Sequence, residues 1–76
     1  MYYFYVNFPR VSDKTILIHS GACSKCNNGL GLRGLGSTSR GFWAGPFMQH
    51  AQASAALDLL VSKFVNPPLT SNCDCI

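Results

Sequence analysis

Cys23-Ser-Lys-Cys26-Asn-Asn-Gly29 is the stretch on which the fold of this chain is expected to depend. A second thiol pair, Cys73-Asp-Cys75, lies near the other end of the sequence. A metal knuckle needs two thiolates on a tight turn, and the residues after it often need positive φ, which Asn and Gly tolerate best. A tetrahedral site needs four ligands, so the two pairs together predict one shared centre. Its expected ligands are Cys23, Cys26, Cys73 and Cys75.

A structural zinc ion is the expected occupant of this centre. The terminal pair is spaced as Cys-x-Cys, which is not the usual knuckle spacing, and the fourth ligand therefore stays open. His19, four residues before Cys23, is the alternative ligand. In place of Cys73 or Cys75 it would complete a site of three cysteines and one histidine. The competing interpretation of His19 is a strand-end histidine bonded to the backbone.

The same cysteines allow two other interpretations. Disulfides between the two pairs would staple the same regions, with three connectivities open to four cysteines. A thioredoxin-like redox pair needs its first cysteine at the start of a helix, and a glycine-rich loop follows here instead. Residues 29–34 also match the dinucleotide fingerprint G-x-G-x-x-G, but they join no strand to a helix, so we reject that interpretation.

Length and composition limit the protein to one small domain, residues 1–76. A chain of this size buries only about 60–65% of the surface that its unfolded form exposes, so small domains usually need added disulfides or a structural metal ion. A hydrophobic fraction of 47% and a charged fraction of 12% are typical of a chain that folds. The net charge of +3 reflects scarce acid, with no Glu and three Asp, more than clustered base.

No signal peptide or membrane-spanning stretch is recognisable in the sequence. We therefore expect a cytoplasmic, reducing location, where paired cysteines bind metal more often than they form disulfides.

The fold class predicted from the pattern is α+β, a small antiparallel sheet of three or four strands with one helix packed on a face. Dense aromatic and β-branched runs predict the strands, and an Ala- and Leu-rich run without Gly or Pro predicts the helix. The expected strands are residues 2–8, 14–19, 41–47 and 69–72, with a hairpin turn at 9–13, a glycine-rich loop at 27–40 and a helix at 48–64.

Two side-chain patterns predict how these elements pack. Aromatic residues on both faces of the first strand indicate a central strand, or an edge that a second copy covers in a homodimer. In the helix, one face at helical spacing is expected to pack on the sheet. It consists of Ala56, Leu59, Leu60 and Phe64.

The glycine-rich loop and its surroundings are the candidate partner-binding region. Basic side chains beside aromatic rings are how single-stranded nucleic acid is bound, although three charges form a weak footprint. These partner-binding candidates are Lys25, Arg33, Arg40 and Trp43. For catalysis, the three scattered aspartates and the absence of Glu offer no recognisable acid–base or nucleophile pair, so no enzymatic activity is expected.

An ordered set of motifs runs from His19 onward. It starts with His19-x-Gly21-x-Cys23-x-x-Cys26-Asn27-x-Gly29-x-Gly31 and continues with Trp43-x-Gly45-Pro46-Phe47, an Ala-rich stretch and the terminal cysteine pair. The set resembles a group of short, mostly uncharacterised bacterial proteins with the pattern HxGxCxxCNxGxG, WxGPF and a terminal Cys-x-x-Cys. The resemblance implies a small metal-binding α+β module and no established activity. This chain departs from the pattern in its terminal Cys-x-Cys.

The function expected on these grounds is that of a zinc-stabilised module that binds another protein, such as a phage- or bacterium-encoded inhibitor or accessory protein. The alternative is a nucleic-acid-binding module that uses the basic loop and its aromatic neighbours.

Overall fold

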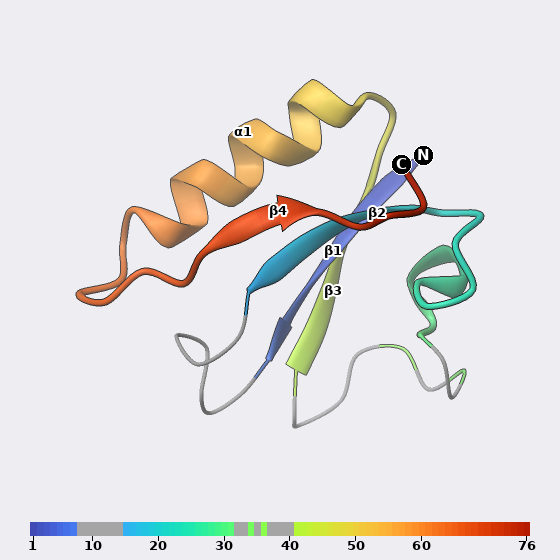
Figure 1. Cartoon of the computed structure of the whole chain (residues 1–76), viewed down its shortest axis with the longest axis horizontal. Coiled ribbons are helices and arrows are strands. Elements are labelled where there is room, and N and C mark those ends of the chain that lie inside the picture. Colours follow the sequence, from blue (N-terminus) through green and yellow to red (C-terminus); the bar gives the residue numbers. More distant parts are fainter. Residues whose placement is uncertain (8–14, 32–33, 35, 37–40) are drawn as a thin grey trace.

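The structure is a computed structural model of the chain, and it describes residues 1–7, 15–31, 34, 36 and 41–76. Within these residues, four strands form one sheet, with a single α-helix on one of its faces (Figure 1). In chain order the elements are β1 (Tyr2–Asn7), β2 (Ile16–Ser20), the short 3-10 helix η2 (Asn27–Gly29), β3 (Gly41–Phe47), α1 (His50–Val61) and β4 (Thr70–Asn72). The predicted α+β class is confirmed. The last residue of the predicted first strand, the predicted turn at 9–13, the first residue of the predicted second strand and half of the glycine loop lie outside the described residues.

The sheet has the order β3-β1-β2-β4. β1 pairs antiparallel with both β2 and β3, so the central-strand alternative for the aromatic N-terminal run is correct. β1 is paired with β3 along one edge and with β2 along the other at Tyr2, Tyr3 and Phe4, so this half of the strand has no free edge for a second copy.

The last strand differs from the expected arrangement, since β4 runs parallel to β2. The reason lies in the helix that precedes it. The chain leaves β3 at one end of the sheet, and α1 carries it back to the end at which β3 began (Figure 1). A strand that follows such a crossover runs parallel to the strand before it, which here is β3. β3 and β2 are both antiparallel to β1, so β4 is parallel to β2 as well.

The core lies between the sheet and α1. Side chains alternate between the two faces of a strand, and Phe4 and Val6 of β1 point to the same face as Ile16 and Ile18 of β2. All four are buried, together with one small and one large residue of the helix. These helix residues are Ala53 and Leu57.

The helix face that packs on the sheet is rotated from the predicted one. Ala56 and Leu60 do pack against the core, but Leu59 is 64% exposed and the helix ends before Phe64. The buried line is centred on Ala53 and Leu57 instead. Close approach of the helix to the sheet is expected from the small Ala51 and Ala55, but both are exposed, and the small residue that is buried against the sheet is Ala53.

The opposite face of the sheet carries aromatic side chains and the turn at residues 23–29, which we call the knuckle. Tyr3 is nearly buried there, and the rings of Tyr5 and Trp43 lie 5.0 Å apart. The turn after Cys26 sits over Tyr3, and it does so with three successive residues at positive φ. These are Asn27 (48°), Asn28 (52°) and Gly29 (85°), which confirms the conformation predicted from the Asn-Asn-Gly sequence.

No helix among the described residues is both long enough and apolar enough to cross a lipid bilayer.

The turn provides a test of this packing. A Cβ atom at Gly29 would lie 3.0 Å from Cε2 of Tyr3, whereas one at Gly34 (φ 69°) would meet nothing within 4 Å. We expect Gly34→Ala to lower the free energy of unfolding by about 1–2 kcal/mol, the cost of positive φ for a residue with a Cβ. Gly29→Ala should cost clearly more, since the contact with Tyr3 is added. Urea denaturation of both variants checks this, and equal losses would contradict the packing of the turn on Tyr3.

Candidate metal centre

Two neighbouring strands and the turn after β2 bring the candidate ligands together. β2 and β4 are paired so that Ile18 lies beside Asn72, and the next residues along, His19 and Cys73, are therefore neighbours. The N–H of Cys73 donates to the carbonyl of Ile18 at 2.9 Å, which extends the ladder past the end of β4. Cys23 follows on the turn after β2, where its N–H donates to the carbonyl of Ser20.

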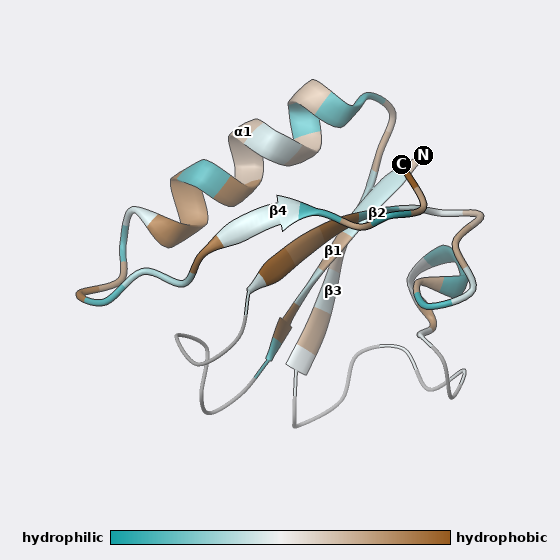
Figure 2. Ribbon diagram, viewed as in Figure 1, coloured by the Kyte–Doolittle hydropathy of each residue, from teal (hydrophilic) through white to brown (hydrophobic). Residues whose placement is uncertain are grey.

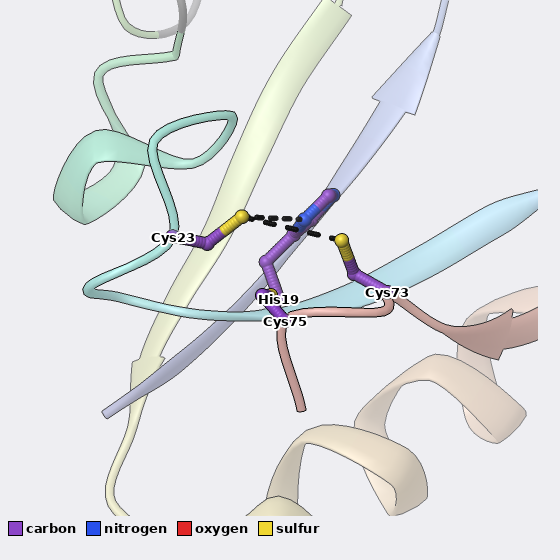
Figure 3. A group of neighbouring side chains, drawn as sticks. All are labelled: His19, Cys23, Cys73 and Cys75. Atoms are coloured by element: carbon purple, nitrogen blue, oxygen red, sulfur yellow. Dashed lines mark hydrogen bonds between the residues drawn. The ribbon is translucent and has the colours of Figure 1, made fainter.

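Four side chains converge at this point. Their ligand atoms all lie within 4.8 Å of one another, close enough to hold one metal ion. Figure 3 shows them pointing toward a common centre from β2, the following turn and the C-terminal segment. The four residues are His19, Cys23, Cys73 and Cys75.

The cysteines in this group are not covalently joined. The sulfur of Cys23 lies 3.9 Å from Nδ1 of His19 and 4.0 Å from the sulfur of Cys73. A disulfide would place two sulfurs about 2.05 Å apart. All four cysteines of the chain are free thiols in this structure, which favours the metal interpretation over the disulfide one.

The group differs in one member from the expected set of ligands. His19 belongs to it, but it takes the place of Cys26 rather than that of Cys73 or Cys75. Cys26 is fully buried under the turn. Burial raises the pKa of its thiol, and the nearby sulfurs of Cys23 and Cys73 raise it further. The structure therefore brings together three of the four predicted cysteines and the alternative ligand, and leaves Cys26 beside them.

Hydrogen bonds within the group give its thiols unequal acidity. The pKa of Cys23 is lowered, first by a hydrogen bond from the thiol of Cys75 and then by the backbone N–H groups of Lys25 and Cys26, which outweigh some desolvation. The pKa of Cys75 is raised to about 11, chiefly by desolvation of its thiol and also because Cys23 and Cys73 favour its protonated form. Cys23 is thus the thiol most ready to act as a thiolate ligand.

His19 is held in the form that binds metal. It is 7% exposed, and its ring lies 5.5 Å from the ring of Trp43. Burial lowers the pKa of its imidazole, and the positive charge of Lys25 lowers it further. The neutral ring that results at pH 7 has a lone pair available for a metal ion.

The partner-binding candidates are only partly visible in this structure. Lys25 is exposed on the knuckle, whereas Arg33 and Arg40 lie outside the described residues. Trp43 is half-buried between Tyr5 and His19, so its ring contributes to the face of the sheet beside the candidate centre.

Comparisons with known proteins give no relative for this chain. No protein-family profile, no curated protein and no solved structure matches it.

The unequal acidity of the thiols predicts an order of reactivity in metal-free protein. The thiolate is the reactive form, so Cys23 should be alkylated by iodoacetamide at pH 7 faster than Cys75, although Cys75 is the more exposed residue. Mass spectrometry of the alkylated peptides measures both rates.

Two controls accompany this measurement. Cys75→Ala removes the hydrogen bond to Cys23 and should slow its alkylation, and denaturant should bring the rates of all four cysteines together. Faster reaction at Cys75 in the folded protein would contradict the hydrogen-bond arrangement.

Proposed function

We propose that this chain is a small zinc-stabilised module that acts by binding another protein. The observation that supports it most directly is the convergence of one imidazole and three thiols from segments far apart in the sequence. Such a donor set is typical of structural zinc sites, which have four protein ligands in a tetrahedral arrangement.

The distances within the group are compatible with zinc. A thiolate sulfur binds zinc at about 2.3 Å, so two sulfurs at neighbouring corners of a tetrahedron lie about 3.8 Å apart. The sulfurs of Cys23 and Cys73, which lie 4.0 Å apart, need only a small movement to reach that distance. A structural zinc ion brings about 10–16 kcal/mol of apparent binding energy, much more than the marginal core of a chain of this size supplies.

Support for a binding role comes from the end of the molecule where α1 is followed by β4. Large apolar side chains are exposed there on the last turns of the helix, on the loop that follows and directly before β4. They are Leu59 (64% exposed), Val65 (96%) and Leu69 (77%). Exposed apolar side chains of this size gain stability when a partner covers them. No observation on the described residues favours the nucleic-acid alternative, and our proposal is confined to a protein partner.

Ligand substitutions test the zinc centre. Protein purified without added metal should contain about one zinc ion per chain by elemental analysis, as a single four-ligand site requires. Cys23→Ser, Cys73→Ser and His19→Ala should each lose most of the zinc and unfold or nearly unfold, because binding energy is folding energy in such domains.

The matched control is Cys26→Ala, which removes a buried thiol outside the group and should keep the zinc ion. The chain has a single tryptophan, and Trp43 lies against His19, so its fluorescence reports metal binding directly. Folded, metal-free protein with four intact thiols would contradict the proposal. Loss of zinc in Cys26→Ala would indicate instead that the ligands are the four cysteines.

A salt titration tests the kind of partner. Complexes captured by the protein from a cell lysate should persist between 0.1 and 0.5 M NaCl, because apolar contacts are not weakened by salt. Nuclease treatment should leave the same complexes intact. Contacts to phosphates would lose affinity by orders of magnitude over the same range. Val65→Ser combined with Leu69→Ser should reduce capture, with the exposed Ala55→Ser as a control. Nuclease-sensitive, salt-labile capture would favour the nucleic-acid alternative instead.

A further inference from the structure

The outer edge of β4 has unpaired backbone groups. The carbonyl of Leu69 accepts from the N–H of Ile16, and the N–H of Cys73 donates to the carbonyl of Ile18, so the odd-numbered residues of this segment face β2. Successive residues of a strand alternate in direction, and the N–H and C=O groups of Thr70 and Asn72 therefore point away from the sheet. No other backbone group of the described residues bonds to them. These two donors and two acceptors are those that an added strand would use.

A cavity lies next to this edge, between α1 and β4. Its volume is about 220 Å³, and Ile18 and Leu57 provide apolar lining. The helix contributes His50, Ser54 and Asp58, three residues spaced one turn apart on one face. β4 contributes all three of its residues, Thr70, Ser71 and Asn72. Figure 2 shows the change in character at this point, with β4 pale beside the strongly hydrophobic β2.

The wall of the cavity is fixed without a ligand. Nε2 of His50 donates to Oδ1 of Asn72 at 2.6 Å, which ties the start of α1 to the end of β4. The same imidazole ring lies perpendicular to the ring of Tyr2, with ring centroids 5.6 Å apart. A site that is already ordered loses less entropy when a ligand binds than one that must order on binding.

The charge of the cavity selects its ligand. Asp58 is the one carboxylate among the lining residues, none of them is Lys or Arg, and it has no ion pair within the described part of the chain. α1 starts beside Asn72 and runs back along β4, and eight residues of helix advance about 12 Å. Asp58 therefore lies toward the Thr70 end of the strand. A side chain with an aliphatic stem and a cationic end matches the apolar lining and this carboxylate.

We propose that the edge of β4 and the adjacent cavity form a docking site for an extended peptide segment of the partner protein. The segment adds to β4 as a fifth strand, and a Lys or Arg side chain opposite Thr70 enters the cavity and pairs with Asp58. This inference rests on the proposed protein-binding function and specifies its surface and the chemistry of its partner. Strand addition of this kind takes affinity from backbone hydrogen bonds and specificity from the pocket for one side chain.

The probe is a synthetic heptapeptide, Ac-Thr-Val-Thr-Lys-Thr-Val-Thr-NH2, titrated into ¹⁵N-labelled, zinc-loaded protein and followed by NMR. We expect saturable shifts at the amides of Thr70, Asn72 and the residues around Asp58. Replacing the peptide lysine with norleucine, or Asp58 with Asn, should each weaken binding about two- to fivefold, as for a partly exposed ion pair. Combining the two changes should weaken it no further than either alone.

A proline substitution in β4 tests the backbone hydrogen bonds to the peptide separately from the ion pair with Asp58. Thr70→Pro removes an N–H that points outward, where an edge strand tolerates proline, and should abolish binding. Thr70→Val keeps that N–H and nearly the same shape, and should bind like the original protein. Should Thr70→Pro fail to fold, N-methylation of the peptide amides along one edge makes the same test with the unaltered protein.

Several outcomes would overturn the inference. The first two are the absence of saturable shifts and equal peptide binding by Thr70→Pro and Thr70→Val. The third is binding of n-butylammonium at the same amides as tightly as the peptide. The fourth is a homodimer, seen in sedimentation experiments, that Thr70→Pro dissociates. The last two would assign the site to a small amine or to a second copy. Zinc content is measured on the same samples, so loss of peptide binding with one zinc ion retained contradicts only this inference, and loss of zinc contradicts the proposed function.

Discussion

The convergence of one imidazole and three thiols is the constraint on which the rest of the structure depends. His19 is nearly buried and Cys73 is buried, and a polar group removed from water must find a partner to offset its lost hydration. Here the partners are the other members of the group, within 4.8 Å. The same convergence holds the C-terminal segment, since β4 has only three residues and pairs with a single neighbour. A metal ion held by these four side chains would join the turn after β2 to the end of β4.

The two faces of the sheet differ in what they carry. One face is covered by α1 and holds the apolar core, with Phe4, Val6, Ile18 and Leu57 among its buried residues. The other carries Tyr3, Trp43 and the knuckle, and the candidate centre lies at the end of this face. The proposed docking site belongs to the helix side, at the β4 edge that α1 leaves open. The proposed docking edge and the candidate ligands thus lie on different sides of the sheet, although β4 leads directly into Cys73.

Much of the fold could be predicted from local patterns. The aromatic run of β1, the Gly-Phe-Trp run of β3 and the Ala-rich helix have the composition of the elements they form, and the Asn-Asn-Gly turn needed positive φ as expected. The choice between alternatives on one element was harder. Leu59 and Leu57 are equally apolar, but only Leu57 is buried, because the packing angle of α1 on the sheet selects the face. The cavity beside β4 had no signal in the sequence, since His50, Ser54 and Asp58 read as an ordinary solvated helix face.

The sequence by itself determined most of the strands, the helix and the positive-φ turn after Cys26, because composition and turn chemistry are local properties. It also predicted that the two cysteine regions share one centre, because a four-ligand site needs donors from both. Only the tertiary structure decided which donors face one another. The parallel pairing of β4 with β2 places Cys73 next to His19, while the turn that follows Cys23 leaves Cys26 buried beside the group. Strand direction and side-chain orientation across fifty residues depend on the crossover through α1, which no local pattern around the cysteines encodes.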